Sequence, residues 1–229
     1  PNEAALNYVD HLHKVPRADA PDYIDELLNL CSKYKVQVII PLISEEIMPV
    51  WTNMEKFERI GAKVLLSGKD SLIGIANNKM KLNDYLLHHG IKVMPKTRKL
   101  NMNTLESDLK DFGYPKEPIV LKMEDACGGI GFKILDEDKA KMVNGMSSRE
   151  ARVNPYIGIE QLYQMPDEIR SRYMIQEFLP GRELGTLCLV DHGRTVYAVS
   201  HDNYEMQYAT TTNCELVDNS RARDIASKL

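Results

Sequence analysis

Helix-like and strand-like segments alternate through the first part of this chain, and this alternation restricts its fold more than any other sequence feature. Residues 22–34 repeat apolar side chains at helical spacing, and residues 36–41 form a short β-branched run typical of a buried strand. Residues 44–60 are typical of a second helix, capped by Ser44, and residues 62–66 of a second strand. Because this order favours a parallel sheet with helices on its faces, the pattern predicts an α/β protein.

The length of the chain, 229 residues, corresponds to one large domain or two small ones. No strand is evident before residue 21, although a unit of this kind normally begins with one. The N-terminal unit is therefore expected to lack its first strand.

Composition and charge exclude several classes of protein. Twenty-nine lysines and arginines against 33 acidic residues give a net charge of −4, which argues against a dedicated nucleic-acid binder. No apolar run approaches the roughly 18 residues of a membrane span, so no membrane partner is expected. The four cysteines are widely spaced and form no Cys-x-x-Cys pair, which favours reduced thiols in a cytoplasmic protein.

The remaining sequence continues the mixture of helices and strands. Helices are expected over residues 78–89, 103–112, 158–163 and 218–229, and strands over residues 118–123, 132–135, 173–178, 183–190 and 195–200. Asn77 or Asn78 is suited to cap the first of these helices, and Asn103 the second. The last two strands are expected to form a hairpin around residues 191–194.

A lysine near the end of an apolar strand, followed by glycines, is the first candidate for chemistry. Lys122 lies in the strand, and Gly128, Gly129 and Gly131 come within the next nine residues. Glycine lets backbone N–H groups approach an anion closely, and the lysine adds a positive charge. The stretch fits neither the P-loop pattern nor the dinucleotide fingerprint. It is either a phosphate cradle or a flexible hairpin loop beside a solvated lysine.

Positive charge also collects around Lys79, at the start of a predicted helix. Residues 78–99 contain six lysines and arginines and a single acidic residue, in a chain that is acidic as a whole. A helix N-terminus itself favours anions, so this patch suits a phosphate group. The alternative is a solvated helix face.

The third candidate is the segment from Met174 to Glu183, where an apolar strand runs into a Pro-Gly turn. Free backbone groups at a strand end can read the edge of an adenine, and a carboxylate two residues after Gly181 can accept hydrogen bonds from ribose hydroxyls. Taken alone, this segment is better explained as a strand and a turn without a ligand.

Together the three segments have an order and spacing that resemble the ATP-grasp superfamily, specifically its carbamoyl-phosphate-synthase-like and biotin-carboxylase-like carboxylate ligases. The resemblance implies an α/β ATP-grasp fold with a truncated Rossmann-like pre-ATP-grasp domain over residues 1–70. Residues 71–229 would then form an ATP-grasp domain that lacks its C-terminal strands.

The resemblance also implies a nucleotide site. Lys79 would contact the α-phosphate, Lys122 the phosphates and the adenine, and the loop of Gly128, Gly129 and Gly131 would fold over the β- and γ-phosphates. Gln176 and the Glu177 carbonyl would face the adenine amino group, the Leu179 N–H would face adenine N1, and Glu183 would hold the ribose. Family chemistry is the phosphorylation of a small-molecule carboxylate by ATP, followed by attack of an amine or similar nucleophile on the acyl-phosphate.

Members of this superfamily hold Mg²⁺ through glutamate and asparagine side chains in a stretch that does not occur in these 229 residues. No metal ligand and no catalytic residue is therefore assigned, and these residues alone are expected to bind nucleotide weakly and to show no ligase turnover. Apolar surface left uncovered would favour a homo-oligomer. The competing interpretation is a non-catalytic nucleotide-binding module or an inactive fragment.

Overall fold

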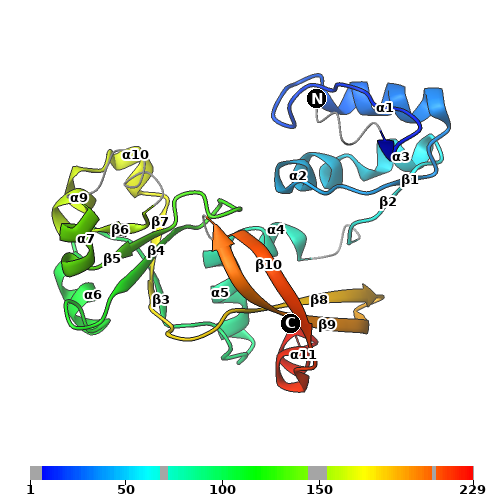
Figure 1. Ribbon diagram of the computed structural model, residues 1–229. Coiled ribbons are helices and arrows are strands. Elements are labelled where there is room, and N and C mark those ends of the chain that lie inside the picture. Colours follow the sequence, from blue (N-terminus) through cyan, green and yellow to red (C-terminus); the bar gives the residue numbers. More distant parts are fainter. Residues whose placement is uncertain (1–6, 68–71, 144–153, 208–209, 229) are drawn as a thin grey trace. The chain divides into compact units, whose positions relative to one another are not determined.

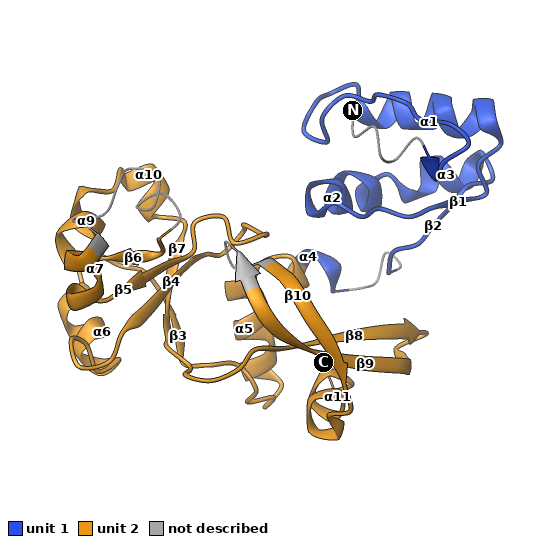
Figure 2. Cartoon of the chain, viewed as in Figure 1, with its two compact units in different colours: residues 1–74 blue, residues 75–229 orange. Residues whose placement is uncertain are grey.

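The computed structural model describes residues 7–67, 72–143, 154–207 and 210–228. They form two compact units, residues 1–74 and residues 75–229, which are coloured separately in Figure 2. The boundary expected after residue 70 lies outside the described residues. Each unit is therefore described by itself.

The first unit contains short helices and a parallel pair of strands. Its elements are α1 (Tyr23–Tyr34), β1 (Val38–Ile39), α2 (Ser44–Thr52), α3 (Met54–Arg59) and β2 (Lys63–Val64), and α4 (Ile73–Ala76) spans the boundary to the second unit. β1 and β2 pair in parallel, as the strand–helix–strand pattern predicted. Apolar side chains from these elements form the core of the unit: Tyr23, Cys31, Val50, Phe57 and Ala62.

Three predictions for this unit were wrong. The single helix expected over residues 44–60 is broken at Asn53, whose side-chain amide donates to the Pro49 carbonyl at 2.9 Å while its backbone N–H bonds to Val50 at 3.1 Å. Ser44 is the first helical residue and makes no capping bond. The strand expected to be buried is partly exposed, with Val38 52% and Ile40 56% accessible, because β2 is its only partner among the described residues.

The second unit is built on a five-stranded sheet with the order β3-β7-β4-β5-β6 (Figure 1). Its strands are β3 (Thr97–Lys99), β4 (Ile119–Met123), β5 (Lys133–Leu135), β6 (Tyr156–Ile157) and β7 (Tyr173–Glu177). The helices of this part are α5 (Lys79–His88), α6 (Leu105–Asp111), α7 (Glu137–Val143), α9 (Ile159–Gln164) and α10 (Asp167–Arg170). All pairs in the sheet are antiparallel except β5 with β6.

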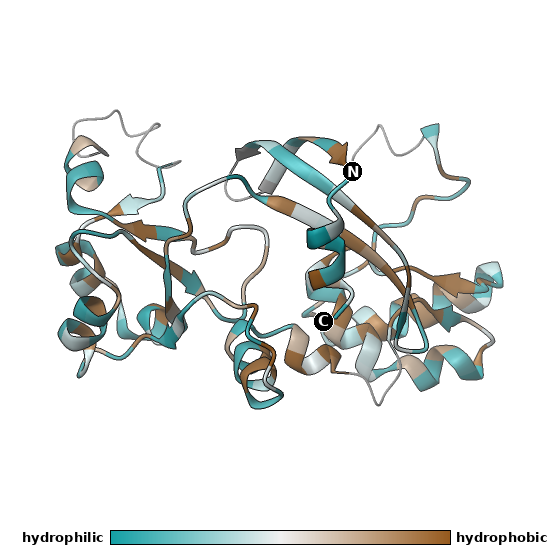
Figure 3. Ribbon diagram, turned by 90° about the horizontal axis from the view of Figure 1, so that it is seen from below, coloured by the Kyte–Doolittle hydropathy of each residue, from teal (hydrophilic) through white to brown (hydrophobic). Residues whose placement is uncertain are grey.

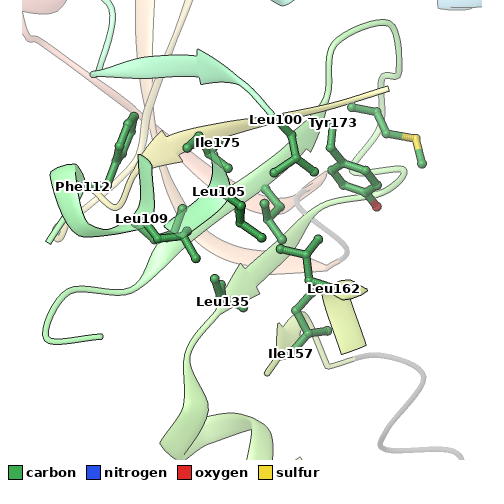
Figure 4. Packing of buried hydrophobic residues seen from close by; sticks show 12 residues of the cluster. Leu100, Leu105, Leu109, Phe112, Leu135, Ile157, Leu162, Tyr173 and Ile175 are labelled. Atoms are coloured by element: carbon green, nitrogen blue, oxygen red, sulfur yellow. The ribbon is translucent and has the colours of Figure 1, made fainter. Parts of the chain in front are cut away.

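The two central strands of this sheet separate the hydrophobic core from a second face, the polar face, which carries Lys122 and Gln176 beside the buried Val120 and Met174. Side chains alternate along a strand, so Ile119, Leu121 and Met123 of β4 lie on one face with Ile175 of β7. These residues belong to the main core of the unit, which Figure 4 shows with side chains from α6 and α9 packed against the sheet. The even-numbered residues of both strands consequently lie on the opposite face, and Lys122 is one of them.

A separate three-stranded antiparallel sheet follows, with the order β10-β9-β8. It comprises β8 (Leu184–Asp191), β9 (Arg194–Gln207) and β10 (Thr210–Val217), and α11 (Ser220–Ala226) contacts the first two strands. The predicted hairpin is confirmed, but β9 is longer than expected and β10 was not predicted. Hydrophobic and hydrophilic residues are interleaved along these elements (Figure 3), and several large apolar side chains remain exposed on the sheet, namely Leu187, Leu189, Tyr197 and Leu216.

The helix caps show how local sequence fixes the element boundaries. Asn78 caps α5 as predicted, because its Oδ1 accepts from the Lys81 N–H at 3.0 Å. Asn103 does not cap α6: Thr104 occupies the capping position, and its hydroxyl bonds instead to Asp108 at 2.7 Å. The alternation of helices and sheets confirms the α/β class.

Candidate nucleotide-binding site

Lys122 and Gln176 meet on the polar face of the five-stranded sheet. The register pairs Lys122 with Met174 and Val120 with Gln176, which makes Lys122 and Gln176 diagonal neighbours on adjacent strands. Lys122 Nζ donates to Gln176 Oε1 at 2.9 Å, and Gln176 Nε2 donates to Thr97 Oγ1 at 3.0 Å. Gln176 is only 5% exposed, so both ends of its amide are held by these neighbours. Burial lowers the pKa of Lys122, as does the nearby charge of Lys79, whereas Glu183 raises it.

Lys79 joins the start of α5 to the loop that follows β4. Its ammonium donates to the Met123 carbonyl at 3.2 Å and to the Ala126 carbonyl, and its backbone N–H donates to Glu124 at 2.9 Å. Burial lowers the pKa of Lys79, although Cys127 and Asp125 act in the opposite direction. Through these bonds the Lys79 ammonium holds the start of the glycine loop. The positive charge of Lys79 also lies close enough to Lys122 to lower the pKa of Lys122.

The glycine loop follows β4 and contains three residues in left-handed backbone conformations. Gly128, Gly129 and Gly131 have φ values of +58°, +74° and +74°. These values are accessible to glycine at little cost but strain other residues. Two turns shape the loop, since the Ile130 N–H donates to Cys127 at 3.1 Å and the Phe132 N–H donates to Gly129 at 3.1 Å. The loop expected from the sequence is confirmed.

Replacing Gly131 with alanine is expected to destabilise the protein more than replacing Gly128. Both positions require a left-handed backbone, which costs an alanine about 1–2 kcal/mol. A Cβ at Gly131 would also lie 2.8 Å from Cγ and Sδ of Met123, whereas one at Gly128 meets nothing within 4 Å. Because methionine is flexible, we expect an additional cost of about 1 kcal/mol at Gly131. Denaturant unfolding of the two variants measures this difference, and equal midpoints would contradict the contact with Met123.

Glu183 precedes β8 and is held by β9. Asn203 Nδ2 donates to Glu183 Oε1 at 3.2 Å, and the Asn203 N–H donates to the Glu183 carbonyl at 3.1 Å. The carboxylate is close enough to Lys122 to raise the pKa of that lysine. The Glu183 carboxylate, the Lys79 ammonium and the buried Gln176 amide are thus gathered around Lys122.

Glu177 and Leu179 lie at and beyond the end of β7. Glu177 pairs with the neighbouring segment through two bonds: its N–H donates to the Lys96 carbonyl at 2.9 Å, and its Oε1 accepts from the Lys96 N–H at 2.7 Å. The Leu179 side chain is 62% exposed. The Glu177 carboxylate is therefore engaged in tying the strand end to Lys96, and the proposed adenine contacts of this segment involve backbone atoms.

The structure brings most of the predicted site residues together and adds three that the sequence analysis missed. Lys79, Lys122, Gln176 and Glu183 are connected by hydrogen bonds or by the influence of their charges on the pKa of Lys122. The missed residues Thr97, His201 and Asn203 hold Gln176 and Glu183 in place. Gly185 was an available signal for the last two, because a glycine inside a strand often marks a close approach by another group.

Among the described residues, no group of three or more histidines, cysteines, aspartates or glutamates comes together in a way that could hold an ion. In the same ranges, every helix is too short or too polar to span a bilayer.

Comparisons with known proteins concern the fold of the chain. Residues 1–65 match the PylC-like, N-terminal domain family. No curated protein sequence gave a significant match. The structure is similar to the biotin carboxylase domain of Hydrogenobacter thermophilus 2-oxoglutarate carboxylase, with a TM-score of 0.57 and 12% identity over 95% of this chain and 46% of that chain.

A second similar structure is pyruvate carboxylase from Rhizobium etli, with a TM-score of 0.55 and 15% identity over 95% of this chain and 18% of that chain. The present chain thus spans less than half the length of either solved chain. Both likenesses cover 95% of this chain. This chain therefore has an ATP-grasp, biotin-carboxylase-like fold.

Proposed function

We propose that this protein binds ATP at the polar face of the five-stranded sheet and uses it to activate a small-molecule carboxylate. The observation that carries this proposal is the pairing of two partly buried ammonium groups, Lys79 and Lys122, beside a loop with three left-handed glycines. Burying a positive charge costs free energy unless an anion compensates it. A polyphosphate supplies that compensation.

The other side chains of the cluster suit a nucleoside. Gln176 and the strand end after it would face the adenine, and the Glu183 carboxylate would accept hydrogen bonds from ribose hydroxyls. The side chains proposed for the adenine and for the ribose lie on either side of the phosphate-binding lysine, because Lys122 is near both Gln176 and Glu183. The Hydrogenobacter structure contains MgADP, ADP and bicarbonate, which supports a nucleotide and a carboxylate-like anion for this fold.

The proposed reaction has two steps. An oxygen of the substrate carboxylate attacks the γ-phosphorus of ATP, and ADP leaves with the electron pair of the broken P–O bond. An amine or similar nucleophile then attacks the acyl carbon, and inorganic phosphate leaves. Lys79 and Lys122 would offset the charge of the phosphates and align them, which is the main protein contribution to phosphoryl transfer. Mg²⁺ bound to the nucleotide would neutralise further charge.

Glu183→Gln is expected to weaken the binding of ATP and of adenosine by the same factor. The substitution keeps the shape of the side chain but replaces charge-assisted hydrogen bonds with neutral ones, at a cost of about 1 kcal/mol or roughly fivefold in affinity. Because the ribose is common to both ligands, their losses should be equal. Calorimetric titration with each ligand measures them. A loss confined to ATP would place Glu183 near the phosphates instead of the ribose.

Calorimetry with ATP, ADP, AMP and adenosine tests the function as a whole. If the lysines bind phosphates, affinity should fall stepwise as phosphates are removed, and titrations up to about 10 mM ligand reach even millimolar dissociation constants. Absence of any heat or competition at that concentration would contradict the proposal. A ligase would in addition release ADP in a carboxylate-dependent manner, whereas a non-catalytic nucleotide-binding module would bind ATP without turnover.

A further inference from the structure

Three polar side chains form a chain of hydrogen bonds on one face of the β8–β9 pair. The register places Gly185 opposite His201, so Glu183 at the entrance of β8 lies opposite Asn203. Because side chains alternate along a strand, His201 and Asn203 point to the same face as Glu183. His201 Nδ1 lies 2.8 Å from Asn203 Oδ1, and Asn203 Nδ2 lies 3.2 Å from Glu183 Oε1.

Hydrogen-bond chemistry fixes the direction of this chain. An ionised carboxylate only accepts, so the amide nitrogen of Asn203 must face Glu183 and the amide oxygen must face His201. An amide oxygen also only accepts, so the proton between these two side chains belongs to His201 Nδ1. The neutral His201 ring therefore has its proton on Nδ1 and its lone pair on Nε2.

Gly185 makes room for the imidazole ring. A Cβ at this position would lie 2.3 Å from both Cε1 and Nε2 of His201, which is far inside van der Waals contact. The ring thus lies across the backbone of β8, where any residue other than glycine would displace it. A glycine in the interior of a strand weakens the strand, so its presence here matches the need of the histidine for space.

A second pair fixes the backbone at the same point from the other face. Arg182, directly before Glu183, forms an ion pair with Asp202, directly before Asn203, and Asp202 is only 4% exposed. The main chain at Glu183 is also held by the Asn203 N–H at 3.1 Å. The backbone is therefore anchored independently, which leaves His201 and Asn203 to set the direction of the Glu183 carboxylate.

We propose that His201 and Asn203 are positioning residues that hold the Glu183 carboxylate toward the ribose of the bound nucleotide, an inference that rests on the proposed function. The alternative partner of this carboxylate is the Lys122 ammonium, whose pKa it already raises. Without Asn203, the carboxylate would rotate toward Lys122, and the charges meant for ribose and phosphate would neutralise each other. The chain is thus a determinant of sugar specificity.

The experiment compares the affinities of ATP, 2′-deoxy-ATP and 3′-deoxy-ATP. The wild-type protein should prefer ATP to at least one deoxy analogue, and Asn203→Ala and His201→Leu should each reduce this preference about two- to tenfold, the range for loss of one hydrogen bond. His201→Asn should retain it, because an asparagine amide nitrogen takes nearly the place of Nδ1. His88→Leu, at the exposed end of α5, is the matched control and should behave as wild type.

Imidazole ¹⁵N spectroscopy gives a readout that does not depend on nucleotide. In alkaline buffer, the ring signal that disappears in His201→Asn should show the Nδ1-protonated tautomer. The Nε2-protonated tautomer would overturn the hydrogen-bond chain itself. Normal ATP affinity with an unchanged preference in both His201→Leu and Asn203→Ala would overturn the positioning role alone. Absence of ATP binding in the wild type would overturn the proposed function and this role together, whatever the tautomer.

Discussion

Replacing Lys122 with alanine is expected to weaken ATP binding by about 1.5–3 kcal/mol, which corresponds to roughly 10- to 150-fold in the dissociation constant. This is the range for hydrogen bonds to charged groups. Lys122 lies on a central strand of the sheet, next to Gln176 and near Glu183. Calorimetric titration of the purified variant with ATP measures the loss.

Two further variants separate the effect of the Lys122 charge from the effects of side-chain volume and of net charge. Lys122→Met keeps most of the side-chain volume and should lose as much affinity as the alanine variant. Lys110→Ala removes an exposed lysine of α6 and should leave ATP affinity unchanged. If the Lys110 and Lys122 variants lose affinity equally, the effect is one of net charge, and the specific phosphate contact of Lys122 is wrong.

The same lysine gives the binding reaction a pH dependence of predictable sign. The pKa of Lys122 is lowered, mainly by burial, so the ammonium deprotonates at lower pH than in the unfolded chain. As the pH rises through the lowered pKa, ATP affinity should fall toward that of Lys122→Met. The free energy of unfolding should instead rise with pH between this lowered pKa and the ordinary lysine pKa of about 10.4, because the unfolded chain binds more protons than the folded one in that range. The pKa of Lys79 is also lowered by burial, so Lys79 contributes to the pH dependence of both ATP affinity and stability. The pH dependence that remains in the Lys122→Met protein measures the contribution of Lys79.

Local sequence patterns predicted the elements that have a clear apolar run or a capping residue. The apolar run that became β4 and the capped helix α5 were found because each is encoded within about ten neighbouring residues. β3 and β6 were missed because they are two or three residues long and gain their hydrogen bonds from strands distant in sequence. The break at Asn53 depends on a side chain competing for the Pro49 carbonyl, which periodicity does not encode.

The candidate site shows the same division between local and long-range information. Lys122 and its glycine loop are contiguous, so their relation was readable from the sequence. That Gln176 faces the adenine stays a prediction, and the direction of its side chain depends on the β4–β7 register, which places it beside Lys122. Asn203 follows Glu183 by 20 residues and reaches it only because β8 and β9 form a hairpin of a particular register. Contacts of this kind become predictable only when strand pairing is known.

Leu121→Ala, one residue from Lys122, is expected to cause the largest loss of stability, about 2–5 kcal/mol. Leu121 is fully buried, lies between β5 and β7, and faces the main core of the unit, whereas Lys122 faces the site. The variant should lower the melting temperature by about 2–4 °C for each kcal/mol, as calorimetry measures. Leu121→Met, which conserves volume, should cost less than about 1.5 kcal/mol, and Leu187→Ala on the exposed sheet less than about 0.5. Below its melting temperature, Leu121→Ala should bind ATP like the wild type, because removing the core side chain leaves the opposite face of β4 intact. Weakened ATP binding in the folded variant would mean that the two faces of β4 are not independent.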